Sequence, residues 1–381
     1  MKTWITPWGP LSLSRFPYDD DPALQAWSGA DTFLLEDFSR RRLPAGTLVL
    51  VYNDAFGALT CALLMAGYKV AQISDSALSQ RATLWNVEAN HLDDQDLFLL
   101  DSLSVPEGEV VLYRLPRSTD LLEYQLAQIS SYLPAQGTFI ATGMTKEIHT
   151  TTLTLIENLL GPTTTTPADY KARLIHTQPQ PQPRPASRFP FRWSIPSLNL
   201  EIIQHAGVFS AGRLDGGTRL FLEHFPKASH LNGAVVDLGC GNGLLGLVAA
   251  KRSLSADIFC VDESFLAVWS ARESFRINQM GGRGKFLCGD GLEDFDKASV
   301  DLILCNPPFH FQNAQTLSIA QKMFQMSVKV LKPDGELWVV ANRHLGHHKI
   351  LGELFPRVAT VAYDEKYALF RCFKSSEKSA L

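Results

Sequence analysis

Short apolar runs alternate with amphipathic stretches throughout the second half of the chain. The apolar runs predict strands at residues 234–239, 257–262, 284–290, 300–306 and 335–342. The stretches between them repeat apolar residues at helical spacing and predict helices at residues 244–252, 264–278 and 320–331. Short apolar strands joined by helices are typical of a parallel sheet that is covered on both faces. The second half therefore predicts an α/β fold with a doubly wound, Rossmann-like sheet.

The first half of the chain repeats this order of elements. Five of its segments match the second half by pattern: 46–64 matches 233–250, 74–90 matches 262–278, 109–116 matches 300–308, 137–143 matches 335–341, and 171–175 matches 366–370. The second of these pairs ends in an asparagine in both halves, at Asn90 and Asn278. Any two sheets of this class share part of such a pattern, but the matched lengths of the helices and strands favour a duplication. We therefore expect two tandem doubly wound sheets.

A proline-rich stretch separates the two halves. Residues 178–196 hold six of the 21 prolines, together with Arg184, Arg188 and Arg192, and no acidic residue. Such a segment favours extended backbone over a helix or a central strand. We interpret it as a linker that runs into an edge strand, and we expect domains at residues 1–183 and 184–381. Its arginines fit either a solvated connector or a basic strip that faces an anionic partner.

The composition narrows the class of protein. With 381 residues, 45% of them hydrophobic and 19% charged, the chain is long enough for two domains that each bury a core. No apolar run approaches the roughly 18 residues of a membrane span, and the N-terminus lacks the apolar centre of a signal peptide. The net charge of −4 excludes a uniformly basic surface but not a local basic patch. We expect a cytoplasmic monomer.

The cysteines and histidines predict no metal site. The six cysteines are scattered and form no Cys-x-x-Cys pair, so neither a disulfide framework nor a cysteine zinc site is expected. His344, His347 and His348 form one cluster without carboxylates close by in the sequence. We interpret this cluster as a solvated helix face and expect no metal.

A glycine-rich turn follows the strand at 234–239 and opens the next helix. We assign cofactor binding to Asp237, Gly239, Gly241, Asn242 and Gly243 in this turn. Glycines let a ligand approach the backbone, and such turns lie at the carboxyl edge of the sheet, where doubly wound folds bind ligands. The Asp237 carboxylate would repel a pyrophosphate at the helix N-terminus but suits a cation. The sequence therefore predicts S-adenosylmethionine, which carries an ammonium and a sulfonium and no phosphate, rather than a dinucleotide.

Two further acids follow the next two strands. Asp262 ends the strand at 257–262, where a carboxylate can accept both hydroxyls of a ribose. Asp290 stands between two glycines after the third strand and is placed to accept the exocyclic amine of adenine. Both positions are also typical of plain strand-end caps, and the glycine-rich turn favours the cofactor role.

The candidate catalytic residues follow the fourth strand. They are Asn306, Pro307, Pro308 and Phe309. The prolines fix the backbone and remove two N–H donors, which leaves the Asn306 side-chain oxygen and the Pro307 carbonyl as acceptors. Two such acceptors hold an exocyclic NH₂ group with its lone pair towards a methyl donor, so transfer depends mainly on positioning. Phe309 offers a flat face to a planar amine. The alternative is a sharp turn without a catalytic role.

These motifs resemble those of class I amino-methyltransferases. The segment at 207–224 is similar to the cofactor-gating segment of ribosomal RNA guanine-N2 methyltransferases, and this resemblance implies that Phe209 and Thr218 contribute to cofactor binding. With residues 53–59 and 161–166 and the duplicated first half, the resemblance to the RlmG type of the RlmG/RsmC family covers nearly the whole chain. It implies a class I fold, S-adenosylmethionine as cofactor, and the 2-amino group of guanine 1835 in 23S ribosomal RNA as the target.

The first half lacks the motifs that cofactor binding and methyl transfer would need. Its turn at 53–57 keeps one glycine where the second half has three, and the counterpart of Asp262 is Ser74 or Asp75. The segment that corresponds to 306–309 contains two arginines, which suit an RNA phosphate and not a cationic cofactor. We expect a degenerate copy that binds RNA through Arg114, Arg117, Lys146, Lys171 and Arg173. The alternative for these residues is a strand-end or surface role.

Three other functions are compatible with the sequence. A methyltransferase of the RsmC type would modify guanine N2 in 16S ribosomal RNA. A protein glutamine methyltransferase would use the same Asn-Pro-Pro-aromatic chemistry on an amide. A ribosome assembly factor would keep the fold without catalysis, and the complete motifs of the second half argue against it.

Overall fold

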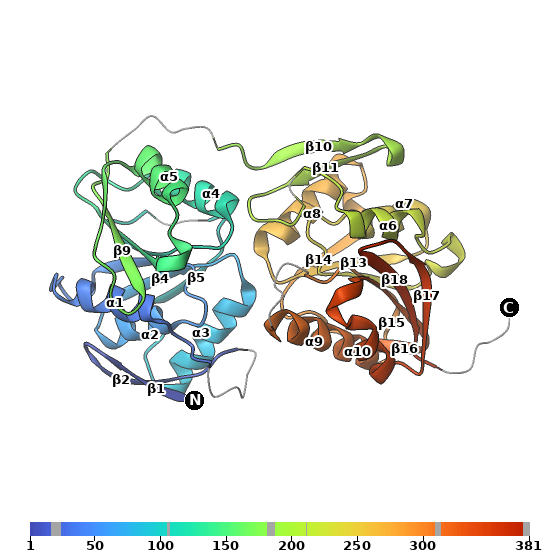
Figure 1. Cartoon of the computed structure of the whole chain (residues 1–381), viewed down its shortest axis with the longest axis horizontal. Helices are drawn as coiled ribbons and strands as arrows, with labels where there is room; N and C mark the ends of the chain where they lie inside the picture. The colour runs from blue at the N-terminus through green and yellow to red at the C-terminus, as the bar shows by residue number, and fades with distance from the viewer. Residues whose placement is uncertain (17–23, 105–106, 181–186, 211, 309–313, 376–381) are drawn as a thin grey trace. The chain divides into compact units, whose positions relative to one another are not determined.

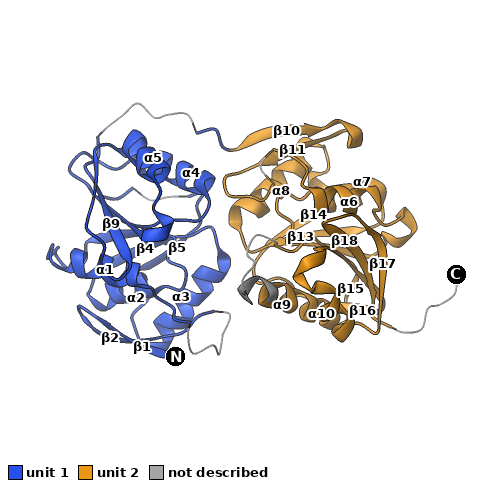
Figure 2. Ribbon diagram, viewed as in Figure 1, with its two compact units in different colours: residues 1–189 blue, residues 190–381 orange. Residues whose placement is uncertain are grey.

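The structure is a computed structural model that describes residues 1–16, 24–104, 107–180, 187–210, 212–308 and 314–375. The chain folds into two compact units, Met1–Phe189 (unit 1) and Pro190–Leu381 (unit 2), which Figure 2 shows in different colours. Each unit contains one seven-stranded sheet and a separate two-stranded hairpin.

The sheet of unit 2 is mostly parallel. Its strands are β12 (Ala234–Leu238), β13 (Asp257–Asp262), β14 (Gly284–Cys288), β15 (Val300–Cys305), β16 (Leu331–Asn342), β17 (Arg357–Tyr363) and β18 (Tyr367–Phe373), in the order β14-β13-β12-β15-β16-β18-β17. The first five strands are parallel, as the alternation with helices predicts. β18 is antiparallel to both of its neighbours, so the doubly wound sheet is mixed at this edge. The loop from β17 to β18 is too short for a parallel crossover.

Helices cover both faces of this sheet (Figure 1). α6 (Gly216–Glu223), α7 (Leu244–Arg252) and α8 (Phe265–Ile277) lie on one face, and α9 (Ala314–Val330) and α10 (His347–Leu354) lie on the other. Neighbouring residues of β12 point to opposite faces, so that Val235 packs beneath α6, α7 and α8, and Val236 packs on the side of α9 and α10. Because both faces are buried, the central strands are apolar throughout.

Unit 1 repeats this architecture. Its strands are β3 (Leu48–Tyr52), β4 (Lys69–Ile73), β5 (Leu97–Leu100), β6 (Val110–Arg114), β7 (Thr138–Met144), β8 (Thr163–Thr165) and β9 (Ala172–Thr177), in the order β5-β4-β3-β6-β7-β9-β8. One face packs against α1 (Gly29–Ser39), α2 (Ala58–Met65) and α3 (Ala77–Ala89), and the other against α4 (Thr119–Ile129) and α5 (Thr150–Leu160). The strand order is the same in both units.

The two hairpins also correspond. β1 (Lys2–Thr6) pairs with β2 (Gly9–Leu13), and β10 (Phe191–Ile195) pairs with β11 (Leu200–Gln204). Asn90, after α3, accepts from Ser12 N at 2.7 Å and donates to Ser12 O at 2.8 Å. Asn278, after α8, makes the same pair of hydrogen bonds with Glu201, at 3.0 and 2.6 Å. Equivalent hairpins on equivalent helices confirm the duplication, and β10 belongs to a hairpin rather than to the edge of the main sheet.

The remaining elements are short. 3₁₀ helices lie at Thr145–Glu147, Pro196–Leu198, Ala228–His230, Gly281–Arg283 and Arg343–Leu345. Across the described residues, no helix has both the length and the apolar character that crossing a membrane would demand.

Candidate functional site

The glycine-rich turn lies at the carboxyl end of β12, as the sequence predicts. Gly239, Gly241 and Gly243 all have left-handed backbone, with φ of 71°, 54° and 79°. An added Cβ at Gly243 would lie 2.7 Å from the Cβ of Ala271 in α8. This glycine is therefore required for close packing of the helices.

The other two glycines leave room above the backbone. Among the described residues, the nearest atom to an added Cβ is Met323 Cε at 3.4 Å for Gly239 and Val208 Cγ1 at 3.9 Å for Gly241. Packing within the protein does not require glycine at these two positions. They leave a cradle of bare backbone in which a ligand can lie.

Unit 1 keeps the packing glycine and loses the cradle. Gly57 has φ of 74°, and its added Cβ would lie 2.6 Å from Thr83 in α3, which repeats the relationship of Gly243 to α8. Asn53 stands in the place of Gly239, since both residues donate a 2.9 Å backbone hydrogen bond to the end of the neighbouring strand. The Asn53 side chain donates to Arg114 O at 3.0 Å and to Gln125 Oε1 at 2.9 Å. A hydrogen-bonded side chain thus occupies the position where unit 2 exposes backbone.

Asp237 lies beneath the start of α7. Its side chain is buried, and Oδ2 accepts a 2.8 Å hydrogen bond from Gly246 N. Burial raises the pKa of Asp237 to about 8, and the charge of Asp262 also raises this pKa. The hydrogen bond from Gly246 lowers the pKa but only partly offsets the effect of burial. A positive charge placed over the loop would offset this cost of ionisation. The position therefore fits a cationic ligand.

Asp262 is positioned by backbone donors at the end of β13. Its Oδ2 accepts from Gly241 N at 2.9 Å, and its Oδ1 accepts from Ser264 N at 3.0 Å. Burial raises the pKa of Asp262, and the backbone hydrogen bonds lower it. A carboxylate offers about four lone-pair sites, so the group retains capacity to accept from a hydroxyl beside these backbone donors. The strand register places Ser74 at this position in unit 1, where no carboxylate is available.

Asp290 is paired with a lysine that the sequence motifs did not mark. Its Oδ2 lies 2.5 Å from Nζ of Lys322 in α9, and Glu293 lies 3.6 Å from the same ammonium. Burial raises the pKa of Asp290, and Lys322 lowers it. The acceptor that the sequence predicts for an amine is therefore shared with an ammonium of the protein itself.

A buried glutamine ties the glycine-rich turn to the segment at 207–224. Gln204 of β11 accepts from Asn242 Nδ2 at 3.3 Å and donates to the carbonyls of Val208 and Phe209, at 2.9 and 3.1 Å. The Phe209 side chain is 39% exposed. Gln204 thus holds the loop that carries Phe209, and Asn242 links the turn to Gln204. Gln204 is a site residue that no sequence motif marked.

Asn306 is oriented by the start of α6. Its Nδ2 donates to Thr218 Oγ1 at 2.9 Å, and the Thr218 hydroxyl in turn donates to Asp215 Oδ2. The Asn306 Oδ1 atom is buried and has no hydrogen-bond partner among the described residues. A buried carbonyl oxygen without a donor is costly, and a bound NH₂ group would satisfy it. Thr218 therefore lies beside the predicted catalytic asparagine, and Asp215 is a second site residue that no sequence motif marked.

The rest of the Asn-Pro-Pro-Phe segment is partly described. Pro307 is buried and Pro308 is exposed, directly after β15. Phe309 lies outside the described residues, so its role stays a prediction.

The predicted RNA-binding cations lie at one edge of the sheet of unit 1. Arg114 and Arg117 follow from the carboxyl end of β6, Lys146 follows β7, and Lys171 and Arg173 lie at the start of the antiparallel β9. Thr145 N donates to Lys171 O at 2.9 Å, which brings the loops after β7 and before β9 together. All of these side chains except that of Arg114 are exposed.

Arg114 has a different environment. Its Nε lies 3.0 Å from Asp31 Oδ1, and the side chains of the pair are 18% and 9% exposed. This internal ion pair and a 3.4 Å hydrogen bond from Nη2 to Ser28 Oγ hold the guanidinium inside the unit, although Nη1 has no partner among the described residues. Arg114 is therefore a structural residue of unit 1, contrary to the sequence prediction of a surface phosphate contact.

Other candidates have structural roles. Arg188 pairs with Asp120 and Glu123, and Arg192 pairs with Glu201, which fits the interpretation of connector arginines. His347 is buried against Phe324, so the histidine cluster is not a wholly solvated face. Among the described residues, no three His, Cys, Asp or Glu side chains are grouped to hold a metal ion.

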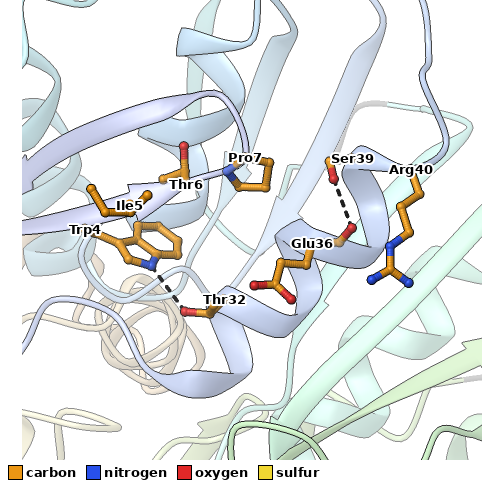
Figure 3. Close-up of a pocket in the computed structure, with 8 residues that line it drawn as sticks. All are labelled: Trp4, Ile5, Thr6, Pro7, Thr32, Glu36, Ser39 and Arg40. Atoms are coloured by element: carbon orange, nitrogen blue, oxygen red, sulfur yellow. Dashed lines mark hydrogen bonds between the residues drawn. The ribbon is translucent and has the colours of Figure 1, made fainter.

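A cavity of about 360 Å³ lies in unit 1, between β1 and α1 (Figure 3). Trp4, Thr32, Glu36 and Arg40 are among its lining residues, and the Trp4 indole donates to Thr32 Oγ1 at 3.2 Å. None of the predicted site residues lines it.

Comparisons with known proteins identify the family of both units. Residues 1–181 match the family model described as the RLMG N-terminal domain, and residues 199–371 match the methyltransferase small domain. The "Ribosomal RNA large subunit methyltransferase G" of Streptomyces coelicolor is 43% identical over 377 residues, which cover 97% of this chain and 99% of that protein. The protein of the same name from Erwinia tasmaniensis is 41% identical and is aligned over 96% of this chain and 97% of its own length.

A solved structure shares the fold of the whole chain. It is the Thermus thermophilus 16S rRNA N2 G1207 methyltransferase (RsmC) in complex with AdoMet and guanosine, with a TM-score of 0.75 and 22% identity. The match covers 98% of this chain and 97% of that one. At this identity the similarity confirms the fold, with two class I methyltransferase sheets in tandem.

Proposed function

Since the chain belongs to the ribosomal RNA large subunit methyltransferase G family, we propose that it methylates the exocyclic N2 amine of a guanine in 23S ribosomal RNA, with S-adenosylmethionine as methyl donor. The target nucleotide that we propose is guanine 1835. Unit 2 carries the chemistry, and unit 1 holds the RNA.

The residues of unit 2 fit S-adenosylmethionine. When bound, this cofactor would supply a methyl group that an amine nitrogen attacks, and the C–S bond would break with S-adenosylhomocysteine as the leaving group. Gly239 and Gly241 offer bare backbone to it, and Asp262 offers lone pairs to a ribose. Asp237 lies beneath the turn, where a bound cation would favour its ionised form. The same cradle would not suit a pyrophosphate, because the acids would repel it.

The observation that carries the proposal is the buried, unpartnered Oδ1 of Asn306. Its amide is held by Thr218, so the oxygen is presented as an acceptor at the carboxyl end of β15. An exocyclic NH₂ group donates to such an oxygen and to the Pro307 carbonyl, which aligns the nitrogen lone pair for attack. The guanine must leave its stack to reach this position, at a cost of a few kcal/mol.

We propose that RNA is held at the carboxyl edge of the sheet in unit 1. Arg117, Lys146, Lys171 and Arg173 provide exposed cations at this edge. Phosphate contacts of this kind position the RNA without reading its sequence. The internal ion pair of Arg114 supports the same division of labour, because it replaces catalytic groups with a structural contact.

Two alternatives are disfavoured by specific observations. A glutamine methyltransferase would not need the exposed basic residues at the carboxyl edge of the sheet in unit 1. A non-catalytic assembly factor has no need for an oriented acceptor at Asn306 or for the cradle that unit 1 has lost. Methylation of 16S ribosomal RNA is the third alternative, and the names of the relatives at 41–43% identity favour the large subunit.

The purified full-length chain provides the test. It should transfer a labelled methyl group from S-adenosylmethionine to protein-free 23S ribosomal RNA and not to 16S ribosomal RNA. Transfer to 16S ribosomal RNA alone would favour the RsmC-type alternative. Absence of transfer to either RNA, with bound cofactor detected by calorimetry, would contradict the proposal.

A further inference from the structure

A chain of hydrogen bonds runs from the N-cap of α6 to the candidate catalytic amide. Asp215 caps this helix, and its Oδ1 accepts from Gly217 N at 2.8 Å and from Thr218 N at 3.2 Å. Its Oδ2 accepts from the Thr218 hydroxyl, and Thr218 Oγ1 accepts from Asn306 Nδ2 at 2.9 Å. The capping carboxylate is thus two hydrogen bonds away from Asn306.

The number of protons available determines which group donates in each of these hydrogen bonds. An ionised carboxylate only accepts, so the single proton of the Thr218 hydroxyl must point to Asp215. The hydroxyl oxygen then has only lone pairs left for Asn306. Asn306 must therefore present its NH₂ group to Thr218 and its Oδ1 to the site, where no other described group satisfies it.

We propose that Asp215 is a positioning residue, which acts through Thr218 to keep the Asn306 amide in the orientation that accepts hydrogen bonds from the substrate amine. This inference rests on the proposed function, because the orientation matters for an amine substrate. The opposite amide orientation would direct two N–H donors at the incoming NH₂ group and exclude it.

Asp215→Asn tests this relationship with little change in shape. Asparagine is as good an N-cap as aspartate, so α6 should be retained. Its NH₂ group, directed at Thr218, would reverse the hydroxyl and favour the wrong orientation of Asn306. We expect kcat for RNA methylation to fall roughly ten-fold or more, with unchanged affinity for S-adenosylmethionine in calorimetry.

Two further variants separate orientation from stability. Asp301→Asn is the matched control, because Asp301 accepts from Ala234 N at 2.8 Å at the opposite end of β15, and it should leave kcat unchanged. Thr218→Val removes the hydroxyl that links Asp215 to Asn306 and should lower kcat by itself. In the Thr218→Val background, Asp215→Asn should have no further effect on kcat, whereas a purely structural cap would lower it in both backgrounds.

Each result separates this inference from the proposed function. An inactive parent chain contradicts the proposed function. Equal kcat for the parent and Asp215→Asn, or equal losses in both backgrounds, overturns the positioning role. The side-chain NH₂ signals of Asn306, assigned by their loss in Asn306→Ala, give a readout without activity. They should shift in Asp215→Asn but not in Asp301→Asn, and unshifted signals would overturn the inference whether or not the chain is active.

Discussion

Arg114 and Asn306 occupy the same place in the two sheets. Tyr113 pairs across the sheet with Tyr52, Cys305 pairs with Leu238, and Arg114 and Asn306 are the next residues along the two strands. Arg114 turns into its own unit and forms an ion pair with Asp31 through Nε, although its Nη1 has no partner among the described residues. Asn306 forms no ion pair and leaves its acceptor oxygen without a partner among the described residues. After the duplication, this position thus became structural in unit 1, whereas in unit 2 it holds the candidate catalytic asparagine.

Replacement of Asn306 by alanine should abolish most of the turnover. We expect a loss on the order of 100-fold in kcat, because one positioned polar group is removed from the reacting amine. The affinity for S-adenosylmethionine should change little, since no part of the cofactor site is removed. Methyl transfer at saturating substrates and calorimetry with the cofactor measure the two quantities.

Asn232→Ala is the control for this variant. Asn232 is exposed in the loop that precedes β12, far along the strand from the glycine-rich turn. Turnover of Asn306→Ala within a few-fold of this control would mean that the Asn-Pro-Pro segment is a structural turn.

The glycines should separate into two classes. Gly243→Ala brings a Cβ to 2.7 Å from Ala271 at a φ of 79°, and we expect it to destabilise the protein by about 2–4 kcal/mol. Gly57→Ala in unit 1 should destabilise it similarly. Gly241→Ala meets no described atom closer than 3.9 Å, so it should cost about 1 kcal/mol of stability and mainly weaken cofactor binding. Urea unfolding and calorimetry distinguish these effects, and equal destabilisation by all three variants would contradict the cradle.

The pH dependence of stability should report on Asp237. Burial raises its pKa to about 8, so the folded state holds this proton at pH values where the unfolded chain has released it. The contribution of Asp237 to stability is therefore largest below about pH 4 and declines as the pH rises to about 8. Asp237→Asn, which stays neutral, should lose less stability than the parent over this range in urea unfolding.

Cofactor binding provides a second test of the Asp237 carboxyl group. A cationic cofactor favours the ionised form of Asp237, so binding below about pH 8 should release a proton. Calorimetry in buffers of different ionisation enthalpy measures this release. If the parent and Asp237→Asn release the same number of protons, the charge of Asp237 does not contribute to binding.

The basic edge of unit 1 should determine the salt dependence of RNA binding. Glutamine at Arg117, Lys146, Lys171 and Arg173 together should weaken RNA binding and lower its dependence on salt, by roughly 0.7–0.9 in logarithmic slope for each phosphate that the variant no longer neutralises. Cofactor affinity should not change. Lys69→Gln, at the amino end of β4, is the control, and filter binding at several salt concentrations provides the measurement. Equal slopes for the quadruple variant and this control would remove these residues from the RNA surface.

Local patterns predict the parts of the site that lie along one strand and its following loop. The glycine-rich turn and Asp262 follow directly from the spacing of strands and glycines. The sequence does not reveal partners that are distant along the chain, such as Thr218, which lies 88 residues before Asn306, or Lys322, which lies 32 residues after Asp290. The ion pair between Arg114 and Asp31 could not be predicted for the same reason. An arginine that follows a strand gives the same sequence pattern whether its guanidinium faces solvent or an internal carboxylate.

Nucleoside mass spectrometry of ribosomal RNA tests whether the protein methylates one guanine in large-subunit RNA. RNA from cells that lack the gene should lose N2-methylguanosine at one position of 23S ribosomal RNA, guanine 1835. The parent gene should restore the modification, and the Asn306→Ala gene should not. An unchanged level of N2-methylguanosine in 23S ribosomal RNA, or a loss confined to 16S ribosomal RNA, would contradict the proposed function.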